Sequence, residues 1–170
     1  MRFSNEKDFD AACGAVIGRL SALLLEKGAW LSAAESLTGG LLASAIVGVP
    51  GASRWFKEGC VTYTDGAKIN RLRVPSDVIS RHTAVSFETA RAMAEGSLLT
   101  SGSDLAVSTT GVAGPGPDDA GHPEGLVYVG AASRHGSAVR ELHLEGDRLG
   151  IRRQAVYEAL KLALKLAKTL

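Results

Sequence analysis

Segments typical of strands alternate with helix-like segments along most of the chain, and this alternation limits the fold more than any other feature. The stretch from Asp8 to Lys27 carries an apolar residue about every 3.6 positions and ends at Gly28, which predicts a first helix. Further helices are predicted over 38–48, 65–72 and 86–99, after Pro75, and from about Asp147 onward. Strands are predicted over 29–34, 59–64, 104–110, 126–134 and 137–146.

The order of these segments predicts an α/β fold, a three-layer α/β/α sandwich around a mixed sheet of about five strands. The sheet is expected to be mixed because the last two strands form an antiparallel hairpin joined at His135 and Gly136. The last helix has a wide apolar surface that includes Leu162 and Leu166, which indicates burial in the core or, alternatively, a homo-oligomer interface.

Length and composition favour one domain over residues 1–170, because 170 residues with 45% hydrophobic content suffice for one core. A net charge of +1 indicates no broad basic surface for a nucleic-acid polymer or an anionic membrane, so a small-molecule ligand is favoured. Cys13 and Cys60 lack metal or disulfide-framework spacing, the N-terminal segment is too charged for a signal peptide, and no apolar run reaches about 18 residues. We therefore expect a soluble, cytoplasmic protein.

Polar and glycine-rich residues follow three of the predicted strands, over 35–40, 62–68 and 109–116. In open α/β sheets, ligands bind where strands end and helices begin. In the first stretch, Glu35 and Ser36 precede Gly39 and Gly40, which let a ligand approach the amides of a helix start. The alternative is that Ser36 only caps that helix.

A serine, a tyrosine and a lysine are available at these junctions. A lysine with a lowered pKa can remove the proton of a serine hydroxyl, so Lys68 and Tyr63 are candidate activators of Ser36. Equally, Tyr63 can be a core aromatic and Lys68 a solvated charge.

Neither a dinucleotide-binding G-x-G-x-x-G after a strand nor a P-loop motif occurs. The histidines share no metal-ligand spacing (His82, His122, His135 and His143).

Five pieces of the sequence, in order, resemble the C-terminal domain family of competence- and damage-inducible CinA proteins, whose stand-alone members are nicotinamide-nucleotide amidohydrolases of the PncC type. The pieces are AAESLTGG, VPGASRWFKEGCVTYTDGAK, HTAVS, GVAGPG and EGDRLGIRRQA, within about residues 30–157. The resemblance implies hydrolysis of nicotinamide mononucleotide to nicotinate mononucleotide and ammonia. It also implies catalysis by Ser36, Tyr63 and Lys68, without a metal or an organic cofactor.

Chemical roles follow for the residues around this group. Backbone amides at Thr38, Gly39 and Gly40 are expected to receive the oxyanion that forms when Ser36 attacks the amide. Lys68 is expected to act as base toward Ser36, directly or through the Tyr63 hydroxyl, and then as acid toward ammonia. Glu35 either orients Lys68 or Tyr63 or forms a structural salt bridge.

The substrate phosphate needs partners of its own. Candidates are the amides of TGVAGPG and the arginines at the start of the last helix, Arg148, Arg152 and Arg153. By their match to the family pieces, Thr110, Gly111 and Arg148 are favoured. Ser86, in the AVS match, is expected to border the same pocket.

The loop after GVAGPG departs from the family pattern, because Glu124 stands where a small apolar residue is usual. An acid pointing into a phosphate site would lower nucleotide affinity or change the preferred substrate. Two other functions therefore stay open beside the deamidase: a non-catalytic nucleotide-binding or stress-associated module, and an amidase for another small amide.

Overall fold

The computed structural model describes residue 3 and residues 5–170. Its strands are β1 (Leu31–Glu35), β2 (Phe56–Val61), β3 (Leu105–Gly111), β4 (Leu126–Ser133) and β5 (Gly136–His143). Its helices are α1 (Glu6–Lys27), α2 (Leu41–Val47), α3 (Asp65–Leu72), α4 (Ser76–His82), α5 (Phe87–Ser101) and α6 (Arg148–Ala167), with a short 3₁₀ helix, η1 (Ala52–Arg54). Within these described residues, no helix is both long and apolar enough to cross a bilayer.

The strands form one mixed sheet in the order β2-β1-β3-β4-β5. β1 runs parallel to both β2 and β3, whereas β4 is antiparallel to β3 and β5. In this register Glu35 at the end of β1 pairs with Val61 of β2 and Thr109 of β3. The carboxyl ends of three neighbouring strands therefore meet at one edge of the sheet.

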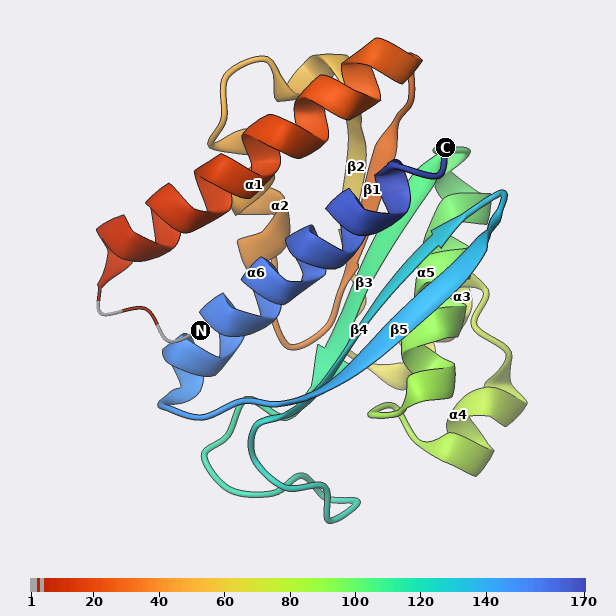
Figure 1. Cartoon of the computed structure of the whole chain (residues 1–170). Helices are drawn as coiled ribbons and strands as arrows, with labels where there is room; N and C mark the ends of the chain where they lie inside the picture. The colour runs from red at the N-terminus through yellow and green to blue at the C-terminus, as the bar shows by residue number, and fades with distance from the viewer. Residues whose placement is uncertain (1–2, 4) are drawn as a thin grey trace.

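Helices cover both faces of the sheet, which confirms the predicted three-layer α/β sandwich (Figure 1). One face carries α1, α2 and α6, and the other carries α5 with α3 and α4 packed beside it. Several predicted boundaries were wrong. α2 begins at Leu41 and not at residue 38, and β5 ends at His143 and not at residue 146. β2 begins at Phe56 and ends at Val61, so residues 62–64 lead into α3, and the β4–β5 turn lies at Arg134 and His135 because Gly136 already pairs with Ser133.

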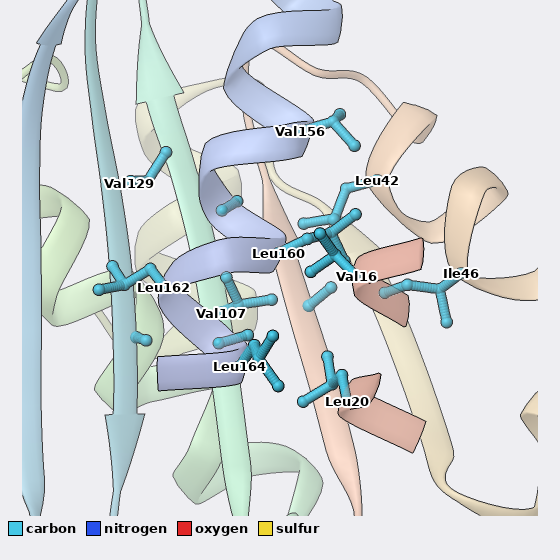
Figure 2. Close-up of a cluster of buried hydrophobic side chains, with 14 of the residues drawn as sticks. Val16, Leu20, Leu42, Ile46, Val107, Val129, Val156, Leu160, Leu162 and Leu164 are labelled. Atoms are coloured by element: carbon cyan, nitrogen blue, oxygen red, sulfur yellow. The ribbon is translucent and has the colours of Figure 1, made fainter. Parts of the chain in front are cut away.

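The main core fills the space between the sheet and the layer of α1, α2 and α6. Figure 2 shows how side chains from these helices interlock with those of β3 and β4, and it labels Val16, Leu20, Leu42, Ile46, Val107, Val129, Val156, Leu160, Leu162 and Leu164. Leu162 is buried in this cluster and Leu166 packs against it. The apolar surface of α6 is therefore covered largely within the chain, as the core alternative predicted, and a homo-oligomer stays a prediction.

Alternate residues of β1 face opposite layers, as the pleat of a strand requires. Leu31 and Ala33 pack in the main cluster, whereas Ala34 packs in a second cluster with Leu72 and Met93. By the same alternation, Glu35 faces the α2 layer and Ser36 faces the α3 layer. Two neighbouring polar residues thus enter different environments.

Candidate active site

Ser36 and Lys68 lie together at the edge where β1 and β2 end. Ser36 follows β1 directly, and its amide donates to the carbonyl of Thr109, which fixes it against β3. Lys68 lies on α3, one turn after the helix begins. Its Nζ atom is 3.2 Å from Ser36 Oγ, so the structure brings the predicted base within hydrogen-bond distance of the predicted nucleophile.

The ammonium group of Lys68 is enclosed by uncharged oxygen atoms. The side chain is 1% exposed, and besides Ser36 it donates to the carbonyls of Thr62 at 3.1 Å and Tyr63 at 3.3 Å. Among the described residues, no carboxylate lies within ion-pair distance of it. Burial lowers the pKa of Lys68 below its ordinary value, and the charge of Asp65 offsets only part of this effect.

The Glu35 side chain caps the start of α2, which is neither of the two roles expected for it. Its buried carboxylate accepts hydrogen bonds from the amides of Gly40 at 2.9 Å, Leu42 at 3.0 Å and Ala43 at 2.9 Å. A carboxylate at this position is favourable because the first amides of a helix lack partners within the helix. The expectation that Glu35 orients Lys68 or Tyr63, or forms a salt bridge, was wrong.

The amides of Gly39 and Gly40 are already occupied, which corrects the expected oxyanion site. Gly39 donates to the carbonyl of Ser36, and Gly40 donates to Glu35. Within the described residues, the amides of Leu37 and Thr38 have no hydrogen-bond partner in the protein. These two amides directly follow Ser36 and are the donors left for an oxyanion.

Arg152 holds the turn that carries these amides, a role that sequence reasoning missed. Its Nε atom donates to the carbonyl of Leu37 at 3.1 Å and its Nη2 atom to that of Thr38 at 2.7 Å. The hydroxyl of Thr38 forms a buried hydrogen bond of 2.8 Å with the hydroxyl of Thr109. Arg152, named as a phosphate candidate, instead orients the backbone next to Ser36. Arg153 packs over the ring of Phe9, with 5.6 Å between guanidinium carbon and ring centroid.

The carbonyl of Tyr63 accepts a hydrogen bond from Lys68, but the side chain of Tyr63 makes no hydrogen bond to Ser36 or Lys68 among the described residues. Its side chain is 57% exposed, and its hydroxyl accepts a hydrogen bond from Arg148 Nη2 at 3.2 Å. Among the described residues the hydroxyl has no hydrogen bond to Ser36 or Lys68. Of the two predicted proton routes, the structure therefore contains the direct Lys68–Ser36 contact and lacks the contact through Tyr63.

Arg148 and the glycine-rich loop between β3 and β4 line a pocket of about 240 Å³ next to Tyr63. Residues 111–118 form the rest of its wall, and Arg148 also donates to the carbonyl of Gly114. Gly111 has a φ of 154°, and a Cβ there would lie 2.5 Å from the Leu126 carbonyl oxygen. The chain can therefore turn out of β3 at this point only with a glycine. Gly111 and Arg148, both named as phosphate-binding candidates, thus line the same pocket.

Two other predicted binding residues are engaged in the scaffold. The hydroxyl of Thr110 is buried and donates to the carbonyl of Ala84 at 2.6 Å. Ser86 caps α5, because its Oγ atom accepts from the Thr89 amide at 3.1 Å and donates to the Thr83 carbonyl. Both side chains stabilise the walls of the site, and neither lines the pocket beside Arg148.

The long loop is tied down by its own polar side chains. His122 contacts the Asp118 carboxylate at 2.8 Å through Nδ1 and the Thr83 hydroxyl at 3.3 Å through Nε2. Burial acts to raise the pKa of Asp118, but the hydrogen bonds from His122 and the Ala120 amide outweigh it and leave the pKa below its ordinary value. Glu124 accepts from the Gly116 amide at 2.6 Å.

A profile of the CinA C-terminal domain matches residues 15–167. The chain belongs to the CinA C-terminal domain family. Among solved structures, the competence/damage inducible protein CihA from Agrobacterium tumefaciens is 34% identical with a TM-score of 0.85, over 98% of this chain and 99% of that one. A CinA superfamily protein from Klebsiella pneumoniae 700603 is 30% identical with a TM-score of 0.88, over 93% of this chain and 99% of that one.

Two further relatives are proteins longer than this chain. A competence-damage inducible protein of Clostridium novyi is 44% identical over 142 residues, which are 84% of this chain and 34% of that protein. One of Clostridium kluyveri is 49% identical over 85% of this chain and 35% of that protein. The chain thus spans about a third of the length of these relatives.

Proposed function

We propose that this CinA-family domain is a nicotinamide mononucleotide deamidase, a cytoplasmic amidohydrolase that converts the nucleotide to nicotinate mononucleotide and ammonia. The observation that carries the proposal is the contact of 3.2 Å between Ser36 Oγ and Lys68 Nζ. A buried amine with a lowered pKa and no carboxylate partner among the described residues is suited to act as a base. A module that only bound nucleotides would have no need for this pair.

The reaction begins when the neutral amine of Lys68 takes the Ser36 proton and the serine oxygen bonds to the carboxamide carbon. The resulting oxyanion is stabilised by the free amides of Leu37 and Thr38, which Arg152 holds in place through their carbonyls. The C–N bond then breaks as protonated Lys68 gives its proton to the departing ammonia. An acyl ester on Ser36 remains.

A water molecule cleaves this ester in the second half of the reaction. Lys68 takes a proton from the water, the hydroxide attacks the ester carbon, and the proton passes back to Ser36 as nicotinate mononucleotide leaves. The phosphate of the nucleotide is assigned to the pocket that Arg148 lines, because a guanidinium can bind a phosphate through two hydrogen bonds. Tyr63 orients Arg148 through its hydroxyl.

The test is release of ammonia and nicotinate mononucleotide from nicotinamide mononucleotide by the purified protein with a chelator present. Ser36→Ala should abolish turnover while leaving the fold intact, and Ser44→Ala, which removes an exposed hydroxyl on α2, should change nothing. Binding of the nucleotide without turnover by the unaltered protein would instead indicate a non-catalytic module. Turnover of a different amide alone would refute the substrate assignment.

A further inference from the structure

The carboxylate of Glu124 lies inside the turn that forms the wall of the Arg148 pocket. Its Oε2 atom accepts from the Gly116 amide at 2.6 Å. A Cβ built on Gly114 would lie 2.2 Å from the Glu124 carboxyl carbon, so the acid packs directly against the backbone of the 114–116 turn. An amide that could face an anion is therefore already bound to a carboxylate of the chain itself.

Arg148 also binds the backbone of this turn. It donates to the Gly114 carbonyl, while Glu124 accepts from the Gly116 amide two residues later. Among the described residues the two side chains form no ion pair with each other. A phosphate entering this pocket would thus meet one guanidinium together with a negative charge placed against the same short turn. Glu124 lies against the turn behind this wall, whereas Asp118 lines the pocket directly and adds a second acid.

We propose that Glu124 is a specificity-determining residue that weakens the binding of phosphate-bearing ligands relative to the same ligands without the phosphate. This inference rests on the proposed function, because it assigns the phosphate to the Arg148 pocket. Two like charges close together repel, and the repulsion weakens as ionic strength rises. Glu124 therefore sets how strongly the site prefers a nucleotide over the corresponding nucleoside.

The experiment compares nicotinamide mononucleotide with nicotinamide riboside, which lacks only the phosphate. Because a chain with Ser36 intact is expected to hydrolyse the nucleotide, affinities for both are measured by calorimetry in a Ser36→Ala background, with Glu124 either kept or replaced in Glu124→Gln. The glutamine keeps an oxygen acceptor for the Gly116 amide and removes the charge. Turnover is measured on the chains that keep Ser36. The ratio of nucleotide to riboside affinity should rise about tenfold in Glu124→Gln at low salt, and the gain should shrink in high salt.

Asp119→Asn is the matched control, because Asp119 carries the same charge on the same loop and lines a different cavity. It should leave the ratio unchanged. An equal rise in Asp119→Asn, no rise in Glu124→Gln, or no binding of the nucleotide to either protein overturns the inference. The expected affinity ratios without release of ammonia by the chains that keep Ser36 would refute the deamidase and leave the role of Glu124 supported.

Discussion

The Nζ atom of Lys68 lies 3.2 Å from the Oγ atom of Ser36, although the two residues are 32 positions apart in the sequence. The pairing of β1 with β2 brings them together, because Ser36 follows the end of β1 and α3 begins shortly after β2. The other partners of Lys68 are the carbonyls of Thr62 and Tyr63. A cation held only by uncharged oxygens loses its proton more readily than one in a salt bridge.

The pH dependence of the reaction should therefore report Lys68. Because burial lowers its pKa, the neutral base is populated at a lower pH than for a free lysine, and kcat/KM should rise with pH to a midpoint below 10.5. Initial rates of ammonia release across the alkaline range measure this midpoint. Lys68→Arg keeps the charge but cannot lose it, so near-normal turnover in that variant would exclude Lys68 as the base.

Glu35→Ala should destabilise the fold more than most surface changes do. It leaves the amides of Gly40, Leu42 and Ala43 without their acceptor, at a cost of about 3 kcal/mol in the free energy of unfolding. Urea denaturation measures this loss. Glu35→Gln retains one acceptor oxygen, so its free energy of unfolding should lie between those of the unaltered chain and Glu35→Ala. Equal stability of the unaltered chain and both variants would contradict the capping role.

Arg152→Lys should lower kcat about tenfold with little change in KM. A lysine cannot reproduce the paired hydrogen bonds to the Leu37 and Thr38 carbonyls that hold the oxyanion-binding amides in place. Arg153→Lys, on the adjacent residue, is the control and should leave kcat unchanged, since Arg153 packs on Phe9. Steady-state kinetics with nicotinamide mononucleotide separate the two parameters. A rise in KM alone in Arg152→Lys would instead indicate that this residue binds phosphate.

Ser86→Ala should lower stability by about 1 kcal/mol through loss of the α5 cap. Because the Ser86 hydroxyl is engaged with Thr89 and Thr83, kcat and KM of the folded variant should stay close to those of the unaltered chain. Thermal unfolding and kinetics on the same sample test both statements. A large rise in KM without a change in stability would restore Ser86 as a binding residue.

Asp118 should stabilise the long loop in a pH-dependent way. Its folded pKa is lowered, so its contribution to stability is present above the unfolded value near 3.8 and is lost as pH falls through the folded pKa. The difference in melting temperature between the unaltered chain and Asp118→Asn should thus be largest near neutral pH and shrink in acid. A difference that grows in acid would contradict the sign of this shift.

The sheet and most helices could be predicted from the sequence because apolar spacing and local caps determine them. The bounds of α3 were predicted as residues 65–72, and the first helix was expected to end at Gly28, which has a left-handed conformation in the structure. The start of β2 was missed because Phe56 to Glu58 are mostly exposed on an edge strand and lack the alternation of a half-buried strand.

The candidate site was predictable only in part, because several of its side chains bind backbone atoms. Nearly every residue offers a backbone carbonyl and amide, so residue types alone do not indicate that Arg152 binds two carbonyls or that Glu35 binds three amides. The partner of the Tyr63 hydroxyl likewise depends on α6, which lies far along the chain. Residue chemistry made Ser36 and Lys68 candidates but left a helix cap and a solvated charge as alternatives, and the family resemblance was what favoured their pairing.

The antiparallel pairing of β4 with β3 places the connection between them at the edge of the sheet where Ser36 lies. β4 starts at the edge of the sheet where β1 and β3 end. The connection from β3 to β4 therefore lies at this edge, whatever its length. Ser36 and Lys68, the reacting groups of the proposed function, lie on other connections, whereas residues 111–118 of this one form most of the wall of the Arg148 pocket. Substitutions in this loop can therefore reshape most of the pocket wall while Ser36, Lys68 and Arg148 keep their places on other segments of the chain.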